Sequence, residues 1–174
     1  MMQTLPVAAI VYSTRGAADG PMNELARSLR QRGLRVRGLV QQQTHDGPGG
    51  ARRMMLTDLE SGERFDIGQK LGSGSGSSCV DPGVLAGAGA ALRRALAEGA
   101  DLVIVSRFGE LEATGGGFAS EMLELMGESV PLLTAVSTRF LESWRRFTGG
   151  AGVELAADAG ALDAWFAGLD RAGE

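Results

Sequence analysis

The segment Pro6–Met22, PVAAIVYSTRGAADGPM, decides the fold of this chain. It begins with a continuous apolar run that ends at Tyr12, a pattern typical of a strand buried on both faces of a parallel sheet. A turn of small residues, Ser13–Gly20, follows this strand. Pro21 suits the first position of a helix, and an apolar stripe predicts that this helix continues to about Arg32. The segment therefore predicts a strand, a short turn and a helix in succession.

The residues that follow extend this unit into a larger α/β fold. A second buried strand over 34–40 completes a β-turn-α-β unit, whose crossover is expected to be right-handed. Strand and helix patterns then alternate, which indicates a three-layer α/β sandwich with a mainly parallel sheet. Two strand patterns around Glu60-Ser61-Gly62 predict a β-hairpin insertion. We expect one domain over 1–174, with further helices over 82–98, 117–126, 138–147 and 161–169 and further strands over 53–59, 63–69, 101–105, 130–136 and 153–156.

The composition narrows the classes of partner. The 174 residues carry a net charge of −4, so nothing favours binding to nucleic acid or to an anionic membrane surface. No apolar run approaches the roughly 20 residues that span a bilayer. Met1–Pro6 lacks the basic region of a signal peptide, and we expect a cytoplasmic protein. A single cysteine, Cys79, and a single histidine, His45, predict neither a disulfide framework nor a metal site.

The turn Ser13–Gly20 has the position of a Walker A loop. In that motif, glycines let backbone N–H groups wrap phosphates, while a Lys contacts the phosphates and a Ser/Thr contacts magnesium. Gly16 and Gly20 are present, but Pro21 and Met22 stand where the lysine and the hydroxyl residue are required. A tight turn without a ligand is the alternative to a binding loop. If the loop binds a ligand, the residues expected to contact it are Thr14, Arg15, Gly16 and Gly20.

A second loop, Ser106–Phe118, follows the strand over 101–105. A Walker B strand normally ends in an acidic residue that holds magnesium, whereas this strand ends in Ser106 and Arg107. Arginine in that place turns a cation site into a candidate anion site. A solvated charged loop is the alternative, although the glycine run permits close backbone approach to a ligand. The candidate ligand-binding residues here are Arg107, Glu112 and Gly115.

A third segment, Gly72–Cys79, alternates glycine and serine. Such a composition is typical of a flexible linker. Its place directly before a well-capped helix favours a different role, because serine hydroxyls and glycine N–H groups are good donors to an oxyanion. We expect it to order over a bound ligand as a lid, with Cys79 as either a soft ligand or a small core residue. The candidate residues are Ser73, Gly74, Ser75, Ser77, Ser78 and Cys79.

These motifs resemble those of a bacterial family described as domain of unknown function 2478. The most specific stretch is SRFGELEATGGGF at Ser106–Phe118, where the family pattern is N-K-F-G-K-x-E-A-x-G-x-G-F. Ser106 and Arg107 replace the usual Asn-Lys, and Glu110 replaces a usual Lys. Other matching stretches are RGLRVRGLVQ at Arg32–Gln41, DLESGERFDIGQKLG at Asp58–Gly72, CVDPGVLA at Cys79–Ala86 and VPLLTAVSTRFLESWRRFTGG at Val130–Gly150.

The resemblance implies a P-loop-NTPase-like fold and, since the family's genes are commonly associated with molybdenum-uptake genes, a role near molybdate or tungstate. The sequence therefore predicts a non-hydrolysing oxyanion-binding protein with a degenerate P-loop, no catalytic residues and no required cofactor. The alternatives are a nucleotide-binding protein or weak nucleoside triphosphatase, and a regulatory adaptor with a vestigial site. The expected partner is a small inorganic oxyanion, and the sequence leaves open whether the chain forms a homo-oligomer.

Overall fold

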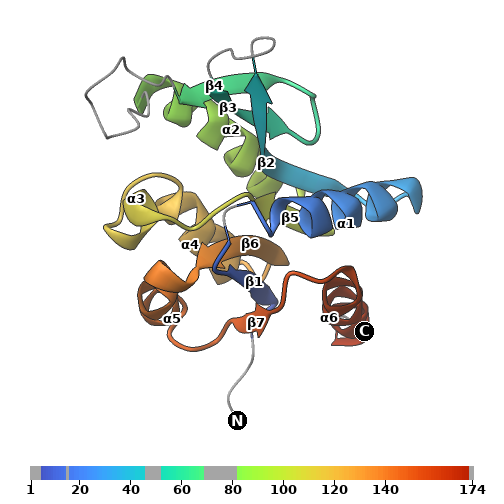
Figure 1. Ribbon diagram of the computed structural model, residues 1–174. Coiled ribbons are helices and arrows are strands. Elements are labelled where there is room, and N and C mark those ends of the chain that lie inside the picture. Colours follow the sequence, from blue (N-terminus) through green and yellow to red (C-terminus); the bar gives the residue numbers. More distant parts are fainter. Residues whose placement is uncertain (1–4, 15, 46–51, 69–81, 173–174) are drawn as a thin grey trace.

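The computed structural model describes residues 5–14, 16–45, 52–68 and 82–172. Within them, seven strands form one sheet in the order β4-β3-β2-β5-β6-β1-β7 (Figure 1). Strands β2, β5, β6, β1 and β7 run parallel, and β3 and β4 continue the sheet antiparallel beyond β2. The predicted mainly parallel sheet with a β-hairpin is therefore confirmed. The strands are β1 (Val7–Tyr12), β2 (Val36–His45), β3 (Arg52–Asp58), β4 (Arg64–Gly68), β5 (Leu102–Val105), β6 (Leu132–Ser137) and β7 (Val153–Leu155).

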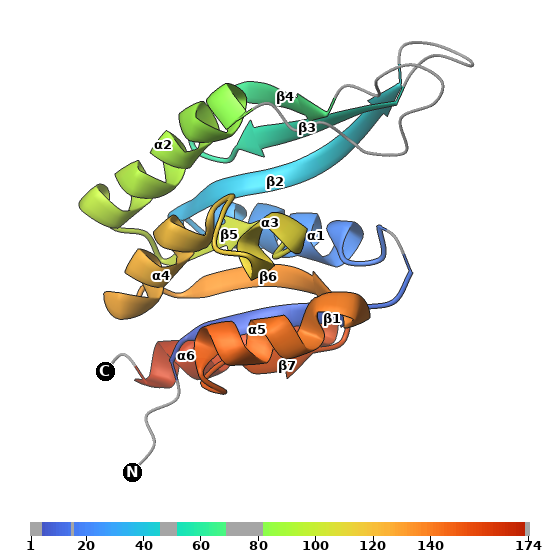
Figure 2. The same ribbon diagram turned by 90° about the vertical axis from the view of Figure 1, so that its left-hand side faces the viewer.

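Helices cover both faces of this sheet, which gives the three layers that the sequence predicts (Figure 2). Helices α1 and α6 pack on one face, where Leu25 and Phe166 join a core with Ile10 of β1. Helices α2, α4 and α5 pack on the other face, where Met122 and Trp144 are buried. The helices are α1 (Asp19–Gln31), α2 (Pro82–Glu98), α3 (Glu110–Ala113), α4 (Ala119–Gly127), α5 (Leu141–Thr148) and α6 (Ala159–Ala172), with a 3-10 turn, η1, at Thr138–Phe140.

Three local predictions are wrong. Helix α1 begins at Asp19 and not at Pro21, so the proline is the third helical residue. Strand β2 continues through Gln41–His45, beyond the predicted end of the strand at residue 40, because β3 pairs with it along this length and supplies the backbone hydrogen bonds. The predicted loop after β5 contains the short helix α3. In each case a contact with another segment, or the geometry of a turn, outweighs the local composition.

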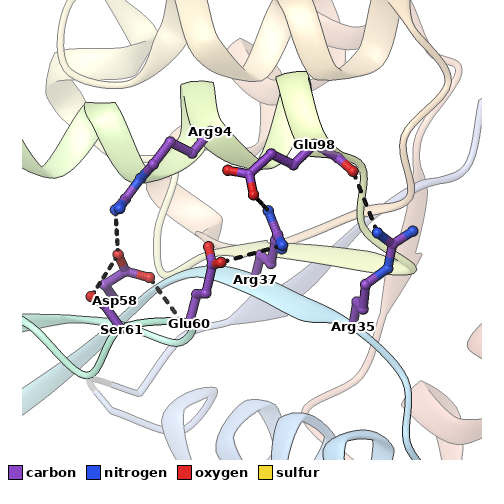
Figure 3. Close-up of polar contacts among 7 residues, drawn as sticks. All are labelled: Arg35, Arg37, Asp58, Glu60, Ser61, Arg94 and Glu98. Carbon is purple, nitrogen blue, oxygen red and sulfur yellow. Dashed lines mark hydrogen bonds and ion pairs between the residues drawn. The ribbon is translucent and has the colours of Figure 1, made fainter.

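A buried carboxylate anchors the hairpin to the helical layer. Asp58, at the end of β3, is only 1% exposed. It accepts hydrogen bonds from the Glu60 backbone N–H at 2.9 Å and from the Ser61 hydroxyl at 3.0 Å. Arg94 of α2 completes the set, with its guanidinium 2.7 Å from the same carboxylate (Figure 3). The turn between β3 and β4 is therefore fixed both to itself and to α2.

A second group of charges lies beside this anchor. Arg37 of β2 is largely buried and lies between two carboxylates, 3.3 Å from Glu60 and 3.5 Å from Glu98 at the end of α2 (Figure 3). Arg35, at the start of β2, donates to the Glu98 carbonyl at 3.4 Å. These contacts join β2, the hairpin turn and the last turn of α2, so the antiparallel extension is held to the parallel core by charge as well as by pairing.

Candidate functional site

Three loops leave the sheet at neighbouring positions along its carboxyl edge. Strand β6 lies between β5 and β1, and Ser137 at its end is opposite Tyr12 at the end of β1. Phe108, after β5, forms a parallel bridge with Val136 of β6. Ligands of parallel α/β sheets bind at this edge. The loops that follow β1, β5 and β6 are therefore the candidate site.

The loop after β1 is a tight turn closed by its own backbone. The Ala17 N–H donates to the Thr14 carbonyl at 3.1 Å, and the Asp19 N–H donates to the Gly16 carbonyl at 3.2 Å. Gly16 has a φ of +82°, which glycine adopts without strain. Thr14 and Gly20 are exposed. The candidate residues Thr14, Gly16 and Gly20 are thus accessible, while two amides of this loop already have acceptors within the turn.

The residue at which α1 begins determines which positions of this loop correspond to those of a Walker A motif. That motif has eight residues between the strand and the helix body, ending in Gly-Lys-Ser/Thr. Ser13–Gly20 is the eight-residue stretch that directly follows β1 and runs into the first turn of α1. Counted this way, Asp19 has the place of the lysine and Gly20 that of the hydroxyl residue. The lysine is absent, as the sequence predicted, but the residue in its place carries the opposite charge.

The Asp19 carboxylate lies on the side of its own loop and interacts electrostatically with Arg107 of the loop after β5. A methyl group placed on Gly16 would lie 3.9 Å from the Asp19 Oδ2 atom. Partial burial raises the pKa of Asp19, and the positive charge of Arg107 partly opposes this increase. A Walker pair has its cation on the first loop and its anion on the second. Here the position of the lysine on the first loop carries an anion, Asp19, and the position of the acid on the second loop carries a cation, Arg107.

The raised pKa predicts how Asp19 affects stability. A carboxyl group whose pKa is higher in the folded state destabilises that state when it is ionised, and this cost disappears as the pH falls and the group is protonated. Asp19→Asn is therefore expected to raise the melting temperature at neutral pH, and the gain should shrink towards acidic pH. Melting curves of both proteins across this pH range test it. A gain that grows as the pH falls would contradict the direction of the shift.

The loop after β5 is organised around Glu112. Its side chain, 8% exposed, accepts hydrogen bonds from the Gly109 N–H at 2.9 Å and the Phe118 N–H at 3.0 Å. Through the Gly109 contact, Glu112 caps the start of α3, whose N-cap residue is Gly109. Gly117 has a φ of +55°, and a methyl group there would overlap the Glu112 carboxylate. Glu112 thus holds together the loop that carries Arg107 and Gly115.

Arg107 and Gly115 lie on the outer surface of this loop. Both are exposed, and Gly115 has a φ of +92°. The Arg107 side chain extends along the loop toward Gly109. A methyl group placed on Gly109 would lie 3.3 Å from the Arg107 Nε atom. Arg107 therefore remains accessible while it lies near both Asp19 and the Glu112 loop.

The loop after β6 adds residues that the sequence analysis missed. Ser137 accepts a hydrogen bond from the Arg139 N–H at 3.3 Å, and the exposed Arg139 guanidinium lies 5.4 Å from the centre of the Phe140 ring. The signal was present in the sequence, because Val-Ser-Thr-Arg at 136–139 repeats the strand-serine-arginine order of Val-Ser-Arg at 105–107. Strand β5 is thus followed directly by a serine and an arginine, and the neighbouring β6 ends in a serine with an arginine two residues later.

The structure brings together only part of the predicted site. Thr14, Gly16 and Gly20 share the first loop, and Asp19 links that loop electrostatically to Arg107 of the second. Arg15 lies outside the described residues, as do Ser73, Gly74, Ser75, Ser77, Ser78 and Cys79 of the predicted lid. Among the residues that the structure describes, no group of three His, Cys, Asp or Glu side chains is placed to hold a metal ion. No helix in the described ranges is long and apolar enough to cross a membrane.

Comparison with known proteins places this geometry in context. The crystal structure of THEP1 from the hyperthermophile Aquifex aeolicus superposes with a TM-score of 0.67 over 94% of this chain and 96% of that one, at 16% identity. The expected P-loop-like fold is therefore confirmed.

A curated relative shares more of the sequence. The molybdenum import ATP-binding protein ModC 2 of Bradyrhizobium diazoefficiens is 35% identical over 160 residues, which are 92% of this chain. The chain spans only 18% of the length of that relative. Residues 7–165 match the family described as protein of unknown function DUF2478, which confirms the resemblance drawn from the motifs. The chain belongs to the DUF2478 family.

Proposed function

We propose that this protein binds a small tetrahedral oxyanion, molybdate or tungstate, at the carboxyl edge of its sheet and does not hydrolyse nucleoside triphosphates. The observation that carries the proposal is the exchange of charges between two loops. Asp19 has the place of the Walker A lysine, and the exposed Arg107 has the place of the Walker B acid. Among the described residues of these two loops, the cation that can meet an anion thus lies on the second loop.

The absence of nucleoside triphosphate hydrolysis is inferred from the residue types present. Phosphoryl transfer depends on a lysine that neutralises the phosphates and on a hydroxyl and an acid that position magnesium. Gly20 has no side chain to offer, and Ser106 and Arg107 end the strand where the acid is expected. We expect no magnesium-dependent hydrolysis of ATP or GTP above background.

Oxyanion binding is inferred from the exposed arginine and hydroxyl side chains at the carboxyl edge of the sheet. Arg107 and Arg139 are exposed guanidinium groups that follow the ends of the neighbouring strands β5 and β6. Guanidinium donors bind tetrahedral oxyanions in a bidentate manner. The exposed Ser13 and Thr14 at the end of β1 offer hydroxyl donors beside them. The name of the curated relative, a molybdenum import protein, favours molybdate or tungstate among the anions of this shape.

Calorimetric titration with molybdate and tungstate tests oxyanion binding. Arg107→Ala is expected to weaken binding about 10- to 100-fold, because one hydrogen bond to a charged group is worth roughly 1.5–3 kcal/mol. Arg30→Ala is the matched control, since this exposed arginine lies in the last turn of α1. It is roughly 16 Å along the helix from Asp19 and should leave the affinity unchanged.

Two outcomes of this titration would contradict the proposal. A wild-type protein that binds neither anion would favour a regulatory adaptor with a vestigial site. Equal affinity in wild type and Arg107→Ala would remove this arginine from the site.

The second candidate function is nucleotide binding, which the words "ATP-binding" in the name of the relative favour. The reversed charges at the first loop oppose it. Titration with MgATP and a phosphate-release assay separate the two candidates. Saturable MgATP binding would support the second candidate, and turnover on the order of one per second would contradict the absence of hydrolysis.

A further inference from the structure

The N-terminal end of α1 already contains an anion of its own. The helix has 13 residues, and its first residue is Asp19. A helix N-terminus attracts negative charge because its dipole and its unpaired N–H groups are directed outward. The Asp19 carboxylate lies on the Gly16 side of this turn, within the electrostatic reach of Arg107. A protein carboxylate thus lies at the helix end that, in a P-loop, faces the phosphates of the ligand.

Two backbone N–H groups of the same turn are already used within the protein. The N–H groups of Ala17 and Asp19 donate to carbonyls of the turn itself, and the Met22 N–H donates to Ala18 within the helix. Pro21 has no N–H group. A polyphosphate in this loop would therefore meet a like charge at Asp19, and the N–H groups of Ala17 and Asp19 would have to leave their present acceptors to bind it.

A single oxyanion has a different route to the edge. It can meet Arg107 and Arg139 from the solvent side without entering the turn, because both side chains are exposed after the ends of β5 and β6. A nucleoside triphosphate depends on the turn for its β- and γ-phosphates. The two ligand classes therefore make different demands on Asp19.

We propose that Asp19 is the specificity-determining residue of this edge, a resident anion that excludes nucleoside polyphosphates and leaves the arginine side open to a single oxyanion. The inference deepens the proposed function and rests on it for the identity of the admitted ligand. The exclusion itself rests only on the position of Asp19 and the pairing of the turn. It predicts that reversing the charge at this position converts the loop towards nucleotide binding.

The test is the double variant Asp19→Lys with Gly20→Thr, which restores the lysine and the hydroxyl of the Walker A pattern. MgATP and MgADP are titrated into full-length wild-type and variant proteins by calorimetry. The double variant is expected to bind MgATP at least about 10-fold more tightly than wild type. Glu24→Lys is the matched control, because it makes the same charge change at an exposed site on the same helix. It should produce no such gain.

Three results would overturn the inference. The first is a folded double variant that binds MgATP no more tightly than wild type does. The second is an equal gain in MgATP affinity in Glu24→Lys. The third is a wild type that binds MgATP as tightly as the double variant does. Melting curves establish whether the double variant is folded. If the double variant is not folded, the nearly isosteric Asp19→Asn replaces it. A smaller gain in MgATP affinity is then expected, and the absence of any gain would contradict the inference. A wild type that binds no molybdate would contradict the proposed function while leaving this comparison intact.

Discussion

Gly38→Ala is expected to be the most destabilising of the single substitutions considered, with a loss of about 4 kcal/mol or more in the free energy of unfolding. Gly38 is buried in β2 and has a φ of +112°. A methyl group there would overlap the carbonyl oxygen of Ile104 in β5 and lie 2.8 Å from its backbone nitrogen. The neighbour is backbone in the centre of the sheet, so neither strand can move aside without breaking the pairing of β2 with β5.

Urea denaturation of Gly38→Ala and Gly33→Ala separates this overlap from backbone strain. Gly33 has a comparable φ of +84°, but a methyl group there would meet nothing within 4 Å. Its substitution should cost only the strain of the left-handed conformation, roughly 1–2 kcal/mol. If the two variants lose the same stability, the contact with Ile104 does not matter, and the prediction fails. Since whole domains are stable by roughly 5–15 kcal/mol, Gly38→Ala is expected to bring the protein close to unfolding.

Glu112→Ala is the second large effect, and it is expected to damage both stability and oxyanion binding. The substitution leaves the N–H groups of Gly109 and Phe118 without their acceptor. A buried donor that loses its partner costs about 1–3 kcal/mol, so a total of roughly 2–6 kcal/mol is expected. Because the same loop carries Arg107, its reorganisation should also weaken binding of molybdate.

Glu110→Ala is the control for Glu112→Ala, since Glu110 is an exposed carboxylate in the same short helix. Chemical denaturation and molybdate titration of the pair are the measurements. Glu112→Gln should fall between wild type and alanine, because its amide retains one acceptor oxygen for two donors. Equal stability of Glu110→Ala and Glu112→Ala would show that the two backbone hydrogen bonds contribute little.

The parts of the fold that the sequence predicted well are those with a local physical signature. Continuous apolar runs such as VAAIVY mark strands that are covered on both faces, and the glycine turn after it marks the passage into a helix. A hairpin turn was predicted at Glu60-Ser61-Gly62 between two strand patterns, and Gly62 adopts a φ of +77° there. These features depend on residues adjacent in the sequence.

The parts that the sequence could not supply depend on residues far apart. The polar run Gln41-Gln42-Gln43 has no strand signature, and only its pairing with Met54–Leu56 of β3 makes it one. Glu112 was predicted as a ligand residue, because nothing local indicates that its carboxylate reaches back to Gly109 and forward to Phe118. Asp19 was overlooked because counting the motif from the glycines, and not from the end of β1, moves the lysine position by two residues.

The strand order has a consequence for how the chain leaves the ribosome. Strand β1 pairs only with β6 and β7 among the described strands, and the first of these partners, Leu132 opposite Val7, is synthesised about 125 residues later. At translation rates of about 5–20 residues per second, β1 waits roughly 6–25 s for its first neighbour. During that interval an apolar strand, of which Val7–Ile10 are buried in the folded protein, has no partner among the described strands. Strand β1, which leads into the first loop of the candidate site, is therefore made before the other described strands and is among the last of them to be paired. We expect the nascent chain to keep this strand shielded until β6 has been made.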